Sequence, residues 1–478
     1  MVQANSASLS RNDIVNLERW LWKGILPLAI AALIFLLGWS QSMPRPSAEP
    51  KKLAVPEEPT AQPISSTSSP LVGSASCTGR GCHGSIEPVT DPSDRDRIWQ
   101  NEYAQFTHDP HAKSYLTLFN DRSQKISRLL ADSKDPTPAH QDRRCLACHA
   151  NPQVAMVPSF AKEEQSFGIG CESCHGNAQK WLVPHADKAW RNLLPQQKWE
   201  QFQMIPVTDL ARRAETCAGC HVGAPPDFAK KLPLRDVNHD LIAAGHPRLN
   251  FELGAFQANM PAHWRSAKTA EGHLWAVGQI ASAQAALDLL IHRADSASAK
   301  SAPWPEFAEY DCFACHHSLN QPSRRQKDER HGRKPGTLPW GSWYFALTRQ
   351  IANDQPSAEA LDRLEEVMQR PYPNPTLAAS SAKKARAALQ GAAKYAARWQ
   401  DETFARKRIH ELVNNDRLPI AASWDGVEQL YFALHATHPS PALNALAKDR
   451  VFRPGYDSPV PSFHPRGFLE KLKALPKN

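Results

Sequence analysis

Residues 145–149 read Cys-Leu-Ala-Cys-His, and a short loop later residues 171–175 read Cys-Glu-Ser-Cys-His. Two cysteines separated by two residues can form thioether bonds to the two vinyl groups of one haem. The histidine that follows them can ligate the haem iron. Each pentapeptide therefore predicts one covalently attached haem, and we expect the surrounding chain to be organised around these groups.

The pattern recurs at residues 217–221 (Cys-Ala-Gly-Cys-His) and 312–316 (Cys-Phe-Ala-Cys-His). A longer version, Cys-Thr-Gly-Arg-Gly-Cys-His at residues 77–83, has four residues between its cysteines. Its two glycines, Gly79 and Gly81, allow the longer loop to fold back to the same vinyl spacing. One isolated Cys-x-x-Cys pair usually binds zinc or forms a redox disulfide, but a histidine directly after every pair favours haem.

All ten cysteines of the chain belong to these motifs. The sequence therefore predicts five covalently attached haems c. The expected thioether bonds are made by Cys77, Cys82, Cys145, Cys148, Cys171, Cys174, Cys217, Cys220, Cys312 and Cys315. The expected proximal iron ligands are His83, His149, His175, His221 and His316.

The ligand on the other side of each iron decides between electron relay and chemistry. Between His108 and His317 the chain has ten histidines outside the motifs, but its methionines there are only Met156, Met204 and Met260. Histidine is therefore the expected second ligand, and replacing methionine by histidine lowers the reduction potential of a haem. The expected distal ligands are His111, His246 and His263, followed by His185 and His239.

His239 and His246 are seven residues apart, so on a continuous helix they would share one face and could serve different haems. Gly245 and Pro247 place the predicted helix end close to His246. Several arginines near the sites either pair with haem propionates or are ordinary surface residues. These arginines are Arg143, Arg144, Arg235, Arg248 and Arg265.

The composition indicates a lean, loop-rich protein, because 41% of the 478 residues are hydrophobic and 40 are prolines. Five porphyrins would supply much of the missing apolar surface. The net charge of +8 is spread along the chain and weakly favours acidic partner surfaces. No basic stripe with interleaved aromatic residues predicts nucleic-acid binding.

The N-terminal part predicts export. Residues 20–39 are mostly apolar, and twenty helical residues span about 30 Å, which is enough to cross a bilayer. We interpret residues 20–40 as a single membrane anchor, with residues 1–19 in the cytoplasm and a Pro/Ser-rich linker at 41–73. A cleaved signal peptide is the alternative. Either places the haems in the bacterial periplasm, where c-type attachment takes place.

The remaining chain divides into a pentahaem domain at residues 74–320, a basic linker at 321–339 and a helical C-terminal region at 340–478. The linker is interpreted as a solvated segment, with a docking patch for an acidic redox partner as the alternative. Apolar spacing predicts an amphipathic helix that covers the haems, three C-terminal helices and a helix that begins near Pro110. The covering helix spans residues 275–293, and the C-terminal helices span 356–368, 376–399 and 423–435.

Residues 145–149, 171–176, 239–249 (His-Asp-Leu-Ile-Ala-Ala-Gly-His-Pro-Arg-Leu) and 311–319 (Asp-Cys-Phe-Ala-Cys-His-His-Ser-Leu) resemble a known family. It comprises multihaem cytochromes c related to the tetrahaem carrier that accepts electrons from hydroxylamine oxidoreductase. The resemblance covers roughly residues 74–350. It implies a mainly helical, loop-rich fold with closely packed haem pairs, histidine axial ligation and periplasmic electron transfer.

The chain departs from that family in its fifth site, the longer gap in residues 77–83, its anchor and its C-terminal helical cap. Some relatives keep one haem five-coordinate, so two histidine ligands at all five irons are not implied. We expect a membrane-anchored carrier of electrons between partners such as other redox proteins or a quinol-oxidising complex. The alternatives are an oxidoreductase acting on a small nitrogen or sulfur compound at a five-coordinate haem, and a subunit that docks other cytochromes.

Overall fold

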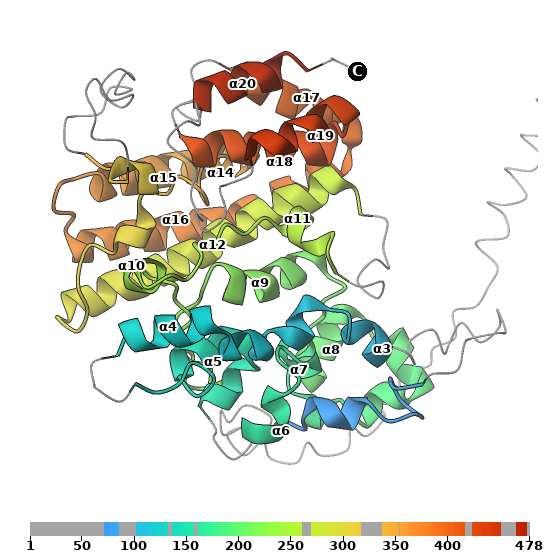
Figure 1. Cartoon of the computed structure of the whole chain (residues 1–478). Coiled ribbons are helices and arrows are strands. Elements are labelled where there is room, and N and C mark those ends of the chain that lie inside the picture. Colours follow the sequence, from blue (N-terminus) through green and yellow to red (C-terminus); the bar gives the residue numbers. More distant parts are fainter. Residues whose placement is uncertain are drawn as a thin grey trace, which may run out of the picture. The chain divides into compact units, whose positions relative to one another are not determined.

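The computed structural model describes residues 71–85, 102–131, 136–156, 161–260, 269–316, 337–352, 354–415, 423–450 and 465–475. The predicted anchor at 20–40 and most of both predicted linkers lie outside these residues. Residues 66–478 form one compact unit. Its described part is helical and has no strands, only isolated β-bridges, so the prediction of a mainly α fold is confirmed (Figure 1).

The first half of the unit consists of short helices joined by loops. Its α-helices are α3 (Glu102–Phe106), α4 (Asp121–Leu129), α5 (Arg143–His149), α6 (Ala161–Gln165), α7 (Cys171–His175), α8 (Pro195–Phe202), α9 (Leu210–His221), α10 (His239–Ala243) and α11 (Leu253–Gln257). Its 3-10 helices are η2 (Ser74–Cys77), η4 (Pro110–Lys113), η5 (Tyr115–Phe119), η6 (Pro152–Ala155), η8 (Ala178–Lys180), η9 (Pro184–Ala186) and η10 (Lys188–Asn192).

The helix predicted from Pro110 is two 3-10 turns, η4 and η5. The Ser114 hydroxyl lies between them and donates to the carbonyl oxygens of His111 at 2.7 Å and His149 at 2.9 Å. A serine hydroxyl that binds nearby backbone groups competes with a regular helix. The break therefore follows from Ser114, whose hydroxyl also ties this segment to α5.

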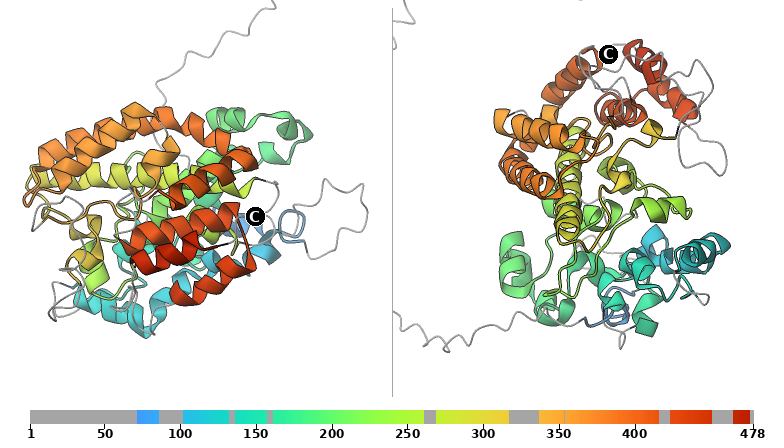
Figure 2. Two further views of the ribbon diagram at one scale, coloured as in Figure 1. Left: turned by 90° about the horizontal axis from the view of Figure 1, so that it is seen from above. Right: turned by 90° about the vertical axis from the view of Figure 1, so that its left-hand side faces the viewer.

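The long helix α12 (Glu271–Ser298) lies at the centre of the unit. We predicted an amphipathic helix over 275–293 that covers the haems. A helix is present there, but it is not amphipathic, because α12 is buried on most of its circumference. α9 packs on one side of it and α16 (Pro375–Ala396) on another, as Figure 2 also shows. Its polar Gln279 is buried and donates to Gln429 at 2.9 Å. By length and composition α12 could cross a bilayer, but most of its apolar stretch is buried within the unit.

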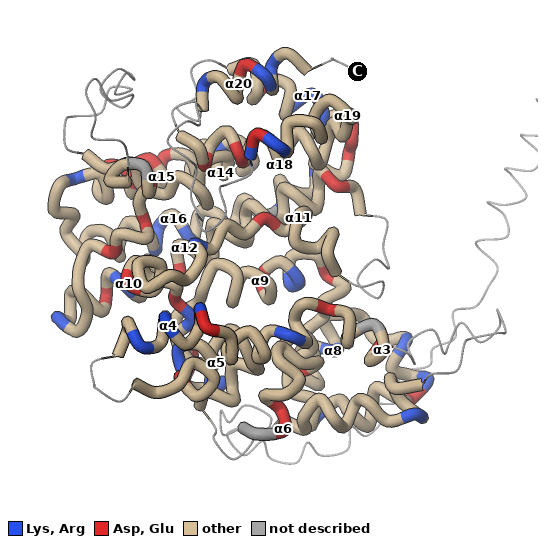
Figure 3. The backbone as a smooth tube through the Cα atoms, in the orientation of Figure 1, with Lys and Arg blue, Asp and Glu red and all other residues tan. Residues whose placement is uncertain are grey.

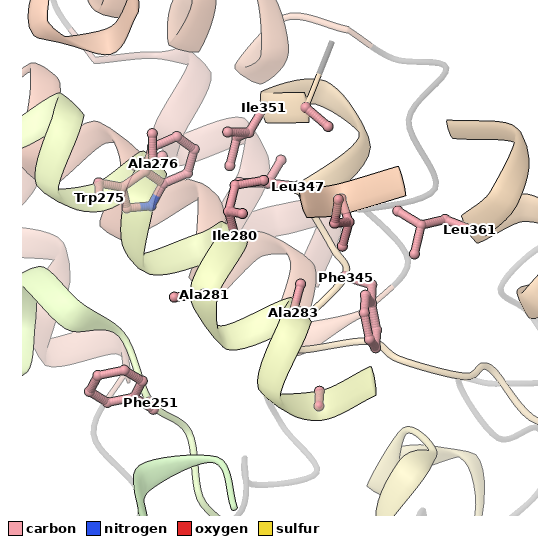
Figure 4. Packing of buried hydrophobic residues seen from close by; sticks show 14 of the residues in the cluster. Phe251, Trp275, Ala276, Ile280, Ala281, Ala283, Phe345, Leu347, Ile351 and Leu361 are labelled. Carbon is pink, nitrogen blue, oxygen red and sulfur yellow. The ribbon is translucent and has the colours of Figure 1, made fainter. Parts of the chain in front are cut away.

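The C-terminal helices share the core of α12. Ile280 packs with Leu347 and Ile351 of the segment after the basic linker, in the same cluster as Trp275 and Phe345 (Figure 4). The domain boundary predicted between residues 320 and 340 stays a prediction. The described C-terminal region nevertheless packs directly on the helix that also supports α9.

The three predicted C-terminal helices are confirmed with shifts of one or two residues, apart from the end of the second. They correspond to α15 (Gln355–Met368), α16 with the 3-10 turn η14 (Ala397–Gln400), and α18 (Trp424–Thr437). Asp354, Asn374 and Ser423 cap their N-termini through side-chain oxygens. The other elements of this region are η12 (Phe307–Glu309), η13 (Cys312–Ala314), α14 (Thr348–Ala352), α17 (Glu402–Val413), α19 (Pro441–Ala445), η16 (Leu446–Arg450) and α20 (Pro465–Lys473).

Charged residues of both signs are interspersed along the described chain (Figure 3). Many of the described ion pairs have an exposed partner, but Arg248 and Arg293 are paired inside the unit, as is Arg450 with Glu428 within the C-terminal region. Arg248 binds Asp425 of α18, and Arg293 binds both Asp236 and Glu309. These pairs join the segment around α10 to α12 and the C-terminal helices.

Candidate haem sites

Each site is named below by its first cysteine. Two of the standard motifs lie at the C-terminal ends of α5 and α9, and a third makes up the whole of α7. Residues three apart on a helix share one face, so this placement turns both cysteines of a motif the same way. Asp142 and Asp209 accept backbone N–H groups at the N-termini of α5 and α9 and so fix where these helices begin.

The longer Cys77 motif is closed by the same backbone contact as a standard motif. In the Cys312 motif the N–H of His316 donates to the carbonyl of Cys312 at 2.7 Å. In the longer loop the N–H of His83 donates to the carbonyl of Cys77 at 3.1 Å. The carbonyl of Gly79 accepts two further N–H groups within this loop. The four intervening residues are therefore folded back, although neither Gly79 nor Gly81 has a positive φ.

Four motif histidines face a second histidine ring. The ring centroids are 6.1 Å apart for His83 and His185, and 5.8 Å apart for His221 and His111. They are 6.3 Å apart for His149 and His246, and 6.4 Å apart for His316 and His239. Each pair joins one predicted proximal ligand to one predicted distal ligand.

This separation fits two imidazoles on opposite sides of one metal ion. A metal–imidazole bond is about 2 Å long, so two ligating rings have centroids about 6 Å apart. Direct ring stacking would bring them closer, as between Phe119 and His140 at 4.4 Å. The four pairs therefore have room for an iron between them, whereas His140 packs on a phenylalanine.

The distal and proximal rings are oriented by hydrogen bonds at Nδ1. His149, His185 and His246 have backbone carbonyl oxygens at this nitrogen, at 3.0, 3.1 and 2.8 Å. A carbonyl oxygen only accepts, so each of these rings must donate its Nδ1–H. Nε2 is then the nitrogen with the free lone pair, as an iron ligand requires.

His83 and His111 have carboxylates instead of carbonyls at Nδ1. Glu102 of α3 lies 2.9 Å from the Nδ1 of His83, and Asp109 lies 2.9 Å from the Nδ1 of His111. Both acids were missed by the sequence analysis. Asp109 stands two residues before His111 in a helix-capping position, which is the one local signal that could have identified it.

Burial keeps two proximal rings neutral. It lowers the pKa of His149, and together with the neighbouring His111 it lowers the pKa of His221 to about 4. Phe251 and Phe256 pack against the His221 ring with centroids 5.2 and 4.9 Å away. A metal ligand must be the neutral imidazole, so this environment fits iron ligation.

The Cys77 and Cys171 motifs lie against each other. Their thiols are within hydrogen-bonding distance, and this contact together with burial raises the pKa of Cys77. Buried Glu172, the residue after Cys171, accepts the N–H groups of Val72 at 3.1 Å and Gly73 at 2.7 Å. This carboxylate therefore ties the start of the Cys77 motif to α7.

The Cys217 motif lies between two other motifs. The thiol of Cys220 is within hydrogen-bonding distance of the thiol of Cys148, and this contact lowers the pKa of Cys220 to about 6. On its other side Cys217 is close enough to Cys174 for their charges to interact. All ten cysteines are free of disulfide bonds, so each remains available for a thioether.

The segment around α10 serves two sites. The N–H of His239 donates to Glu306 at 2.8 Å, which holds this residue beside the Cys312 motif. We considered a continuous helix from His239 to His246, but α10 ends at Ala243 and Gly245 has a φ of 116°. The chain turns there because glycine adopts positive φ without a side-chain clash. His246 is thereby directed to His149.

Two arginines beside the Cys217 motif lack a carboxylate partner in the described chain. Arg235 lies 3.9 Å from the sulfur of Cys220, and its buried Nε has no hydrogen-bond partner. Arg213 is buried, donates to the carbonyl of Val207, and has its pKa lowered by burial. Arg213 is buried and Arg235 is half-buried, and a cation removed from water needs a compensating anion. The carboxylates of haem propionates fit that need.

The other described arginines near the sites already have partners or are exposed. Arg144 binds Asp142 at 2.6 Å, and Arg248 binds Asp425 at 2.9 Å. Arg265 lies outside the described residues, as does the predicted ligand His263. The structure therefore leaves the position opposite His175 unassigned.

A small cavity of about 50 Å³ lies between α10, α12 and the segment that leads to Cys312. Apolar Ile242 and Leu289 line it together with the charged residues Arg248, Arg293 and Glu309, so it is not an apolar pocket. The site residues thus fit haem in two respects: the geometry of the histidine pairs and the arginines beside the Cys217 motif.

Residues 67–176 match the family model described as cytochrome c554 and c-prime. The match spans about a quarter of the chain and includes the Cys77, Cys145 and Cys171 motifs. It supports a c-type cytochrome, with covalently bound haem c and other redox proteins as partners. No curated protein and no solved structure matches the chain.

Proposed function

We propose that the protein is a membrane-anchored periplasmic cytochrome that carries electrons along five haems c between redox partners. The observation that carries the proposal is the set of four histidine ring pairs. An iron with imidazole on both sides has no open position for a substrate, which favours a carrier over an enzyme. The bound haem supplies the one-electron redox change, and the chain supplies ligands, spacing and shielding.

Contacts between the motifs support a linear order of haems. The Cys77 site contacts the Cys171 site, and the Cys171 site is close to the Cys217 site. The Cys217 site contacts the Cys145 site. The Cys145 and Cys312 sites take their distal histidines from one short segment. Electron transfer slows steeply with distance, so we infer that electrons pass through the sites in this order, with the Cys77 and Cys312 haems at the ends.

The sequence supports the cellular placement. Residues 20–40 are long enough and apolar enough for an anchor, and the Pro/Ser-rich residues 41–73 form a suitable tether. Thioether attachment requires export. We therefore propose that the haems stand in the periplasm and exchange electrons with a quinol-oxidising complex or with other redox proteins.

Low-temperature electron paramagnetic resonance of the oxidised, full-length protein in detergent tests the proposal. The paired ring planes cross at 16° at the Cys77 site and 33° at the Cys312 site. They cross at 76° at the Cys217 site and 83° at the Cys145 site. Near-parallel imidazoles give rhombic low-spin signals, and near-perpendicular imidazoles give strongly axial ones with a large highest g value. We expect both kinds of signal.

The haem count and ligand binding complete this test. A pyridine haemochrome assay and the intact mass should both report five haems, and cyanide should leave the four low-spin signals unchanged. Fewer than four haems, or predominantly high-spin iron that binds cyanide, would contradict the carrier and favour the oxidoreductase.

A further inference from the structure

Two of the eight paired histidines have a carboxylate at Nδ1, whereas three others have a backbone carbonyl there. His83 contacts the Oε2 of Glu102 at 2.9 Å, and His111 contacts the Oδ1 of Asp109 at 2.9 Å. Both acceptors are carboxylates shielded from water. The Asp109 side chain is 3% exposed and the Glu102 side chain is 17% exposed.

The orientation of Asp109 is fixed by a second bond. The same Oδ1 also accepts the backbone N–H of His111 at 2.9 Å, as the cap of η4. The carboxylate therefore cannot rotate away without losing both contacts. By contrast, His149, His185 and His246 donate to neutral backbone carbonyls.

A carboxylate changes the ligand more than a carbonyl does. A hydrogen bond to an ionised acceptor is about twice as strong as a neutral one, and it raises the basicity of the imidazole that donates it. A more basic imidazole gives more electron density to the iron and stabilises the ferric state. A buried negative charge near the iron acts in the same direction, because the ferric iron carries one more positive charge.

We propose that Glu102 and Asp109 are positioning residues that lower the reduction potentials of the Cys77 and Cys217 haems. This inference rests on the proposed function, since it takes His83 and His111 as iron ligands. The effect of Asp109 is the larger of the two, because its carboxylate is better shielded from water. Arg213 and Arg235 lie beside the same Cys217 motif and favour the reduced state. Asp109 therefore offsets these cations at that haem.

The consequence for the electron path follows from the proposed order. The Cys77 haem stands at one end, and the Cys217 haem stands in the middle. Lowered potentials at these two positions help the Cys77 haem to pass electrons inward. The lower potential of the Cys217 haem also makes it an energetically uphill step for electrons on their way to the Cys145 site.

The test compares the isosteric variants Glu102→Gln and Asp109→Asn with the wild type. Asparagine is a good helix cap, so Asp109→Asn keeps the cap of η4 and the hydrogen bond to His111 while it removes the charge. The matched control is Glu163→Gln, because Glu163 is an exposed acid on α6. Each full-length, matured protein is titrated spectroelectrochemically, and its haem content and paramagnetic resonance spectrum are recorded.

We expect every variant to keep five haems and its low-spin iron, and we expect Glu102→Gln and Asp109→Asn each to move one haem to higher potential. The movement should be larger for Asp109→Asn and absent for Glu163→Gln. The highest g value of one low-spin signal should change in Glu102→Gln and in Asp109→Asn but not in Glu163→Gln. Asp109→Glu, which keeps the charge, should restore part of the wild-type potential. A purely structural role for the carboxylates would leave the g values of the retained haems unchanged.

The inference is overturned if both variants retain their haems and titrate with the same curve and g values as the wild type. If Asp109→Asn instead loses a haem, Glu102→Gln decides alone, because it lies on a different element and serves a different iron. Failure of the proposed function is distinguishable, since it appears in the wild type as a wrong haem count or high-spin iron.

Discussion

Replacing Asp425 by asparagine removes the charge that neutralises a buried arginine. Arg248 donates from both terminal nitrogens to the two carboxylate oxygens of Asp425, at 2.9 Å each. The Asp425 side chain is 1% exposed and the Arg248 side chain is 17% exposed. The Ser342 hydroxyl also donates to Asp425. Asp425→Asn leaves the buried guanidinium without its hydrogen-bonded carboxylate, while the weaker electrostatic effect of Asp311 remains.

The magnitude follows from this burial. Breaking a buried ion pair from one side costs about 3–5 kcal/mol. Arg248 is partly exposed, and the amide oxygen of asparagine still accepts one hydrogen bond. We therefore expect the free energy of unfolding to fall by about 3 kcal/mol. The control is Asp295→Asn, which breaks the exposed pair between Asp295 and Lys383. Exposed pairs of this kind contribute about 0–1 kcal/mol.

The assay is denaturant unfolding of the full-length, matured protein, followed by far-ultraviolet circular dichroism and haem absorbance. We expect a clear fall in the midpoint for Asp425→Asn and almost none for Asp295→Asn. The double variant Arg248→Met with Asp425→Leu should recover much of the loss, because it leaves no buried charge. If Asp425→Asn has the same denaturant midpoint as Asp295→Asn, the pair between Arg248 and Asp425 does not act as a buried ion pair and the reasoning is refuted.

Three further changes test other parts of the structure. His246→Ala should convert one low-spin haem to a high-spin, cyanide-binding one, whereas His140→Ala should not, and unchanged spectra in His246→Ala would contradict the ligand pairing. Gly278→Ala should destabilise by about 1–2 kcal/mol, because its Cβ would lie 2.6 Å from that of Leu253. Gly391→Ala meets no atom within 4 Å and should stabilise by about 0.5–1 kcal/mol, so equal shifts in thermal unfolding would refute this packing argument. Glu172→Gln should weaken the bonds to residues 72 and 73 and speed hydrogen exchange there, and unaltered exchange would show that the carboxylate does not hold this segment.

The local chemistry of this protein could be recognised from sequence, but the environment of α12 could not. The cysteine motifs and the helix starts at Asp354, Asn374 and Ser423 depend on residues a few positions apart. The sequence of α12 contains the polar residues Gln279 and Ser282. Both are buried, and Gln279 finds its partner in Gln429, which is distant in the chain. The sequence alone does not distinguish a polar residue that is buried with a distant partner from one that is exposed to solvent.

The distal ligands show the same limit. Sequence reasoning named His185 and His239 as candidates, but it had no means of matching either to an iron. His185 lies in η9 and its ring faces that of His83, and Glu172 contributes to this pairing because it holds the Cys77 segment against α7. That arrangement depends on one carboxylate inside a haem motif, where the residue type is otherwise unconstrained.

The turn at Gly245 explains how so short a segment reaches two sites. On a continuous helix His239 and His246 would point the same way, about 10 Å apart along the axis. The glycine breaks this direction, and its carbonyl is held by Arg122 of α4 at 2.8 Å. His239 is held at the other end through Glu306. Both ends of the segment are thus fixed to different parts of the unit. The hydrogen bonds of Arg122 and Glu306 to its backbone therefore help to set the spacing between the Cys145 and Cys312 sites. A carrier benefits from such a rigid spacing, since a small change in separation changes the transfer rate between two haems.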